Sequence, residues 1–123
     1  RDIRKKFEPM KELLPFTEQF NLKNSAVTKS IIQEAINSIL ETKYFSKIKK
    51  IYLFGSVAQG SQIFRSDIDI AVEFKYITLK KATRFRIETR VPEKIDLQVF
   101  NVLPDKIKKE ILKNGKIIYE RKN

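Results

Sequence analysis

Three aspartates have a spacing that could support chemistry at a divalent cation. Asp67 and Asp69 lie two residues apart in an alternating segment, 67–74, that reads as a β-strand, so both side chains project from one face. Asp96 lies in a second alternating segment, 95–100. If the two strands are neighbours in register, three carboxylates meet within a few ångströms, and a cation would reverse the sign of their interaction. The alternative is that the aspartates are ordinary residues on two solvent-exposed strand faces and bind no metal.

The residue types that are missing narrow the chemistry. The chain has no Cys and no His, which excludes disulfides, thiolate nucleophiles, Ser-His-Asp triads and His-ligated zinc. A metal here must be held by oxygen atoms, which suits Mg²⁺, Mn²⁺ or Ca²⁺. Three acids on two strands would leave coordination positions open for phosphate oxygens. This is the arrangement used in two-metal displacement at phosphorus.

Gly55 and Ser56 follow a short apolar and aromatic run, 51–54, that reads as a buried strand ending in a turn. A glycine at such a junction lets backbone N–H groups approach an anion, and the serine adds a hydroxyl donor. A helical turn opening at Ser56 would add its N-terminal dipole. Alone this is a weak signal, because many loops contain the same pair. It gains weight from the ten-residue spacer, 57–66, that separates it from Asp67.

The elements that must position these residues follow from hydrophobic periodicity. An arm, 1–24, is irregular or partly helical, and it precedes a single domain, 25–123. Apolar residues three and four apart predict a first helix. The expected elements of the domain are a helix (25–44), strands (51–54 and 67–74), a basic helix (77–89), a strand (95–100), a helix (104–113) that Asn114 and Gly115 cap, and a strand (116–120). This order predicts an α/β or α+β sheet with helices on one side.

Composition bounds the class of protein. A chain of 123 residues supports one domain. Its 26 Lys and Arg against 15 Asp and Glu give a net charge of +11, which fits a solvated basic surface, steering of an anionic ligand, or attachment to nucleic acid or an acidic protein. No apolar run approaches the roughly 20 residues of a membrane span, and no secretory signal is visible. A cytoplasmic protein is expected.

The motifs combine into a family pattern. LFGS, a ten-residue spacer, DIDIAV and later IDLQVF resemble the minimal nucleotidyltransferases of the polymerase-beta superfamily. The segments VAQGSQIFRSDIDIAVEF and ILKNGKIIYE are similar to that family too, so the resemblance covers about residues 28–121. It implies a mixed β-sheet with helices packed on one face. It also implies transfer of a nucleoside monophosphate to a hydroxyl, with release of pyrophosphate.

The resemblance implies a role for each motif residue. Gly55 and Ser56 would hold the triphosphate of the incoming nucleotide. Asp67 and Asp69 would bind one or two Mg²⁺ ions, with Mn²⁺ as a substitute, and ATP is the expected substrate. Asp96 would ligate the catalytic metal and help to deprotonate the acceptor.

Two further residues are assigned to the nucleotide, and one position departs from the family. Arg65 and Ser66, which directly precede the aspartate pair, complete the expected nucleotide site. Where the family commonly has Arg, this chain has Gln59. The missing cation could be replaced by Arg65 or by other basic residues, although these also read as ordinary surface charges: Lys75, Lys80, Lys81, Arg84 and Arg86.

The motifs do not identify the molecule that accepts the nucleoside monophosphate. Small members resembling this chain are often antitoxins paired with a helical, HEPN-type ribonuclease, which they mask or adenylylate. The resemblance therefore implies a HEPN-type protein partner, while a homodimer stays open. One alternative is a catalytically silent antitoxin that acts by occlusion. Another is a basic nucleic-acid-binding domain, for which Phe85 within TRFR is the main candidate for base stacking.

Overall fold

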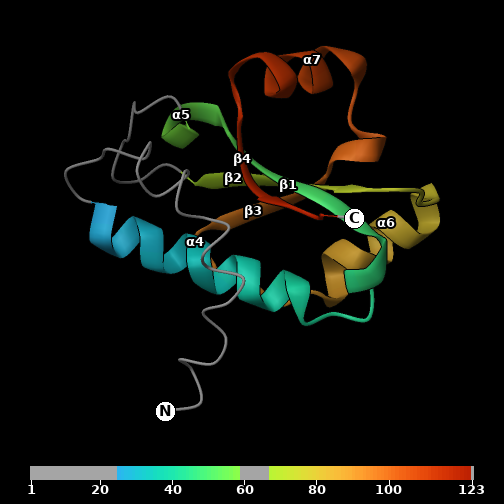
Figure 1. The fold of residues 1–123 in the computed structure, drawn as a ribbon, viewed down its shortest axis with the longest axis horizontal. Helices are drawn as coiled ribbons and strands as arrows, with labels where there is room; N and C mark the ends of the chain where they lie inside the picture. Colours follow the sequence, from blue (N-terminus) through green and yellow to red (C-terminus); the bar gives the residue numbers. More distant parts are fainter. Residues whose placement is uncertain (1–24, 59–66, 123) are drawn as a thin grey trace.

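The computed structural model describes residues 25–58 and 67–122, and the predicted arm lies outside them. These residues form four strands and four α-helices, with two short 3₁₀ turns (Figure 1). In chain order the elements are α4 (Ser25–Leu40), η1 (Phe45–Lys47), β1 (Ile48–Phe54), α5 (Gly55–Ala58), β2 (Ile68–Phe74), α6 (Leu79–Glu88), β3 (Ile95–Val99), η2 (Phe100–Val102), α7 (Asp105–Asn114) and β4 (Lys116–Glu120).

The strands form one mixed sheet in the order β3-β2-β1-β4. β1 is central and pairs antiparallel with β2 and with β4. β2 and β3 are parallel, so α6 connects them as a crossover helix. No helix in the described ranges is long and apolar enough to cross a membrane.

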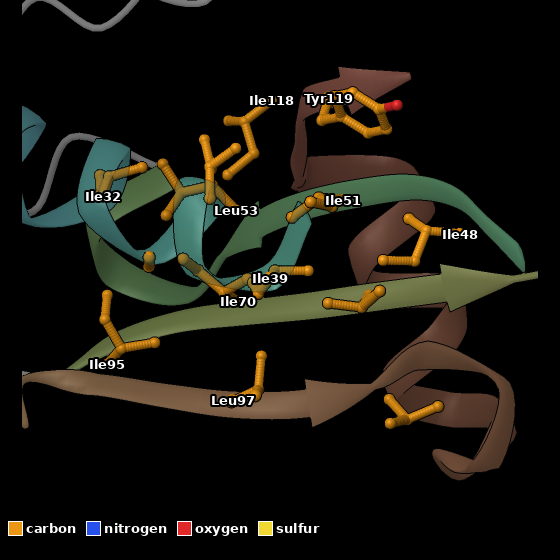
Figure 2. Packing of buried hydrophobic residues seen from close by; sticks show 14 of the residues in the cluster. Ile32, Ile39, Ile48, Ile51, Leu53, Ile70, Ile95, Leu97, Ile118 and Tyr119 are labelled. Atoms are coloured by element: carbon orange, nitrogen blue, oxygen red, sulfur yellow. The ribbon is translucent and has the colours of Figure 1, made fainter. Parts of the chain in front are cut away.

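One face of the sheet carries the main core. Ile32, Ile36 and Ile39 recur along α4 at helical spacing and are at most 1% exposed. They pack on the inward side chains of the strands, which Figure 2 shows for residues such as Leu53 and Ile70. α6 completes this layer with two buried residues, Ala82 and Phe85. Burial of these β-branched side chains supplies most of the drive to assemble the sheet.

The opposite face carries a smaller core under α7. Tyr52 and Phe100 stack with ring centroids 5.1 Å apart, and Ile111 of α7 packs against them. The Tyr52 hydroxyl donates a 2.8 Å hydrogen bond to Glu73. Burial, together with that carboxylate, raises the pKa of Tyr52 above its ordinary value. The predicted sheet with helices on one face is confirmed for α4 and α6, while α7 lies across the other face (Figure 1).

Two β-bulges adjust which side chains reach the core. In β1 the pairing shifts between Ile48 and Lys50, so that Ile48 and Ile51 are both fully buried although they are three residues apart. In β4 the pairing with β1 skips Ile118. Ile118 and its neighbour Tyr119 therefore both join the main core.

The predicted elements are confirmed with shifted ends. The first helix ends at Leu40, before its predicted limit, because a turn and η1 follow it. Gly115 follows the last helix as predicted, but its φ of −77° is not the left-handed conformation of a glycine cap. The glycine is needed there for space, since a Cβ would lie 2.6 Å from the carbonyl oxygen of Ile111.

The prediction that Phe85 could stack on a base is wrong. Phe85 is fully buried, and its ring makes edge contacts with Tyr44 and Phe74 at centroid distances of 5.3 and 5.1 Å. Its position three residues after Ala82 turns it toward the sheet, while the charged residues of the same helix face solvent.

This aromatic cluster generates a stability prediction. Phe85→Ala removes a buried ring and should lower the free energy of unfolding by about 3–5 kcal/mol. Ile87→Ala is the matched control, because Ile87 lies on the same helix but is 77% exposed, and it should change the value by less than about 0.5 kcal/mol. Denaturant titration of both variants measures the difference. Similar losses for the two variants would contradict the packing described here.

Candidate active site

The acidic residues meet where β1 ends and where β2 and β3 begin. In the antiparallel pair of β1 and β2, Phe54 lies opposite Asp69. In the parallel pair of β2 and β3, Asp69 lies opposite Asp96. The two carboxyl groups therefore occupy neighbouring positions on the sheet face that is opposite α4, as their register alone requires. Both side chains are half-buried.

Gly55 closes this cluster from the β1 side. Its φ is +80°, a backbone conformation that favours glycine. A Cβ added at this position would overlap the Oδ2 atom of Asp69. The chain turns at Gly55 directly from β1 into α5 (Figure 1). The first helical turn therefore begins beside the Asp69 carboxyl. Gly55 of the Gly-Ser turn thus lies beside Asp69, as expected.

The electrostatics of Asp69 reflect this crowding. Burial raises the pKa of Asp69 to about 6, and the neighbouring Asp96 adds to the effect through its charge and through a hydrogen bond. The charge of Asp67 contributes in the same direction. Carboxylates placed this close repel one another, so the neutral form of Asp69 is favoured over its charged form.

Gln98 contacts the site although it was not among the predicted site residues. Its Nε2 donates a 2.9 Å hydrogen bond to Oδ1 of Asp96. The two residues are two apart on β3 and so share a face. Gln98 thereby fixes the orientation of the Asp96 carboxyl. The alternation of 95–100 could have revealed this, because it places an amide beside the acid.

The remaining predicted site residues are only partly described. Asp67 precedes the first residue of β2 and is exposed. The backbone of Ser56 belongs to α5, while its side chain lies outside the description. Arg65 and Ser66, like Gln59, lie outside the described residues, so their assignment to the nucleotide stays a prediction.

The idea that Lys81 and Arg84 of α6 replace the missing family arginine does not fit the structure. Lys81 and Arg84 line a cavity with Phe74, the last residue of β2. Asp69 lies five residues earlier on that strand, about 16 Å away at the rise of a β-strand. A side chain at that end of the sheet cannot contact a phosphate held beside Asp69.

The donor set fits a hard divalent cation. Carboxylate oxygens are the ligands that Mg²⁺ prefers, and the raised pKa of Asp69 means that the site favours added positive charge. Within 25–58 and 67–122, no three acids already form a ready cage for a metal ion.

Comparison with known proteins gives consistent results. A family model described as "Polymerase beta, Nucleotidyltransferase" matches residues 34–123. One protein of Methanocaldococcus jannaschii, named as a candidate protein adenylyltransferase, is 38% identical over 74 residues, which are 60% of this chain and 57% of that relative. The chain thus spans little more than half of that relative. A second protein of the same name and organism is 35% identical over 94 residues, 76% of this chain and 92% of the relative.

A solved structure is similar as well. In the crystal structure of a toxin-antitoxin complex, MntA-HpeT, carrying a point substitution, one chain matches with a TM-score of 0.54 and 25% identity. The match covers 73% of this chain and 73% of that chain.

The contact between Gly55 and Asp69 can be tested by a double-mutant cycle. Gly55→Ala should lower the free energy of unfolding by more than about 1–2 kcal/mol, since it adds a left-handed strain of that size to a steric overlap. In an Asp69→Ala background the overlap is gone and only the strain should remain. Chemical denaturation of the four proteins measures the coupling. An equal cost in both backgrounds would show that the two residues do not touch.

The raised pKa of Asp69 predicts a pH dependence of stability in the absence of divalent cations. A pKa of about 6 in the folded chain against an ordinary 3.8 means that the neutral form is favoured by folding. This contribution is therefore present below pH 4 and is lost as the pH rises through 6. The melting temperature of the protein relative to Asp69→Asn should fall between pH 4 and 7 in EDTA. A constant difference would contradict the raised pKa of Asp69.

Proposed function

The chain belongs to the polymerase beta, nucleotidyltransferase family, and on that premise we propose that it transfers a nucleoside monophosphate from a nucleoside triphosphate to a hydroxyl group. The observation that carries the proposal is the register of β1, β2 and β3. It sets Gly55, Asp69 and Asp96 side by side at one end of the sheet. A glycine turn that opens a helix beside a carboxyl pair suits a triphosphate and its cation.

Each residue has a role in this proposal. Gly55 gives the phosphates close access to the backbone N–H groups of the turn, and Ser56 adds its hydroxyl. Asp67 and Asp69 hold one or two Mg²⁺ ions, which supply charge neutralisation and alignment of the triphosphate when bound. Asp96, oriented by Gln98, faces the acceptor. Arg65 and Ser66 contact the nucleotide from the segment that precedes Asp67.

The reaction is a displacement at phosphorus. The acceptor oxygen attacks the α-phosphorus, the bond from that phosphorus to the bridging oxygen breaks, and pyrophosphate leaves. The acceptor proton passes to the carboxylate of Asp96. Positioning and electrostatic stabilisation provide the rate enhancement, as in phosphoryl transfer generally.

We propose AMP as the transferred group and a protein hydroxyl as the acceptor. Two relatives are named as candidate protein adenylyltransferases, and one of them is matched over 92% of its length. The names of these relatives favour an acceptor presented by a second protein over a growing nucleic-acid chain.

The partner is proposed to be the toxin of a toxin–antitoxin pair, of the helical HEPN type. Support comes from the similarity to a chain of a toxin-antitoxin complex at a TM-score of 0.54. In this role the chain neutralises the toxin by adenylylating a tyrosine or a similar hydroxyl.

The enzymatic proposal predicts a metal-dependent label transfer. Incubation with α-labelled ATP, Mg²⁺ and the product of a neighbouring gene should label that product. Asp69→Asn should reduce the rate by at least about 10³-fold, because it removes a carboxylate that binds the cation in the transition state. Glu88→Gln, an exposed acid on α6, is the control and should keep the rate within twofold. Gel autoradiography over one time course measures the rates of the wild type and of the two variants.

Two outcomes would contradict the proposal. If the wild type transfers no label with any of the four nucleotides, although Mg²⁺ binds, the reaction does not occur. If the Asp69→Asn variant still neutralises the partner as well as the wild type does, the chain acts by occlusion and not by catalysis.

A further inference from the structure

A second concave site lies at the end of the sheet that is remote from the acidic residues. It has a volume of about 260 Å³, which lies just below the roughly 300–1,000 Å³ of typical small-molecule sites. Its walls come from the connection between α4 and β1, from the end of β2, and from the start of α6. The lining residues are Lys43, Tyr44, Lys47, Phe74, Tyr76, Ile77, Thr78, Lys81 and Arg84.

The charges around this basic cavity are all positive. Four of the nine lining residues are Lys or Arg, and no Asp or Glu of the described ranges lines it. Lys43 lies over the Tyr44 ring at 5.6 Å, and none of the four forms an ion pair with another described residue. Four cations around one concavity repel one another, and a compact anion would relieve that repulsion.

The cavity is also held in shape. Its inner wall is Phe74, whose backbone N–H and C=O are both bonded at 2.9 Å to the side-chain amide of Asn101. The Tyr44 ring packs edge-on against Phe74 and Phe85. Thr78 caps α6 by accepting from the backbone N–H of Lys81. The basic side chains therefore extend from a packed and hydrogen-bonded frame.

We propose that the basic cavity binds the phosphate of a nucleotide unit, independently of the acidic site. A phosphate carries up to two charges in a small volume, which suits four convergent cations better than a single carboxylate does. Tyr76 is 75% exposed on the lining and offers a free ring on which a base can stack. The cavity holds one phosphate with its sugar, so the nucleotide is either free or one unit of a single strand.

The test measures binding of a labelled single-stranded RNA of about ten nucleotides by fluorescence anisotropy, in EDTA so that the acidic site holds no cation. The double variant Lys81→Ala with Arg84→Ala should bind at least tenfold more weakly. It should also reduce the slope of log affinity against log salt by up to about 0.7, the contribution of one phosphate contact on a single strand. Tyr76→Ala should weaken binding about fivefold or more.

A matched control separates this site from general charge. Lys109→Ala with Lys113→Ala removes the same charge from exposed positions on α7 and should change the affinity by less than twofold. All the variants replace exposed residues, and a thermal melt verifies that each is folded. Equal losses in the two double variants would show that only the net charge acts, and would overturn the proposal.

Competitors identify the source of the phosphate. Displacement of the RNA by AMP indicates that the site binds a free nucleotide. If AMP does not displace the RNA but the Lys81 and Arg84 double variant still binds it more weakly, the site binds one unit of a strand. Both outcomes support the site. Orthophosphate competing as well as AMP, or no binding at all, would overturn it. An oligoglutamate peptide that shows the same loss in the variant would reassign the cavity to an acidic protein. Loss of binding in the Asp69→Asn variant would show that the RNA binds at the acidic site, and would overturn the proposal.

Discussion

Two like charges held at neighbouring positions of one sheet dominate the electrostatics of this protein. Asp69 and Asp96 are register partners on parallel strands, and Gly55 closes the third side. Two unit charges about 4 Å apart repel by roughly 4 kcal/mol near a protein surface. Burial and this repulsion together raise the pKa of Asp69 to about 6. A bound cation would reverse the sign of the interaction, which is the physical basis of the metal site proposed above.

The rest of the fold keeps those charges from moving apart. α4 and α6 cover one face of the sheet, and α7 covers part of the other, so the two central strands, β1 and β2, are packed on both sides. A shift of β3 by one residue would turn Asp96 toward the main core and expose Leu97. The buried isoleucines thus fix the register that brings the acids together. Gln98 then sets the direction of the Asp96 carboxyl within that register.

The sequence predicted the elements and the grouping of the acids, because alternation and helical periodicity are local properties of the chain. It predicted less well what depends on packing in three dimensions. Phe85 looked available between two arginines, yet its helical phase puts it in the core. Gly115 was expected to adopt a left-handed cap, whereas it is required by a close approach to Ile111. Neither distances across the sheet nor the basic cavity at its far end can be derived from local spacing.

The bulge at Ile118 has a further consequence for the open edge of the sheet. β4 is an edge strand, and the outer edge of a strand is a template onto which another chain can add. A bulge twists the strand and interrupts the even spacing of its free amide and carbonyl groups. Lys116 places a positive charge at the first residue of the same strand. Together these features protect a small sheet from aggregation through its last strand.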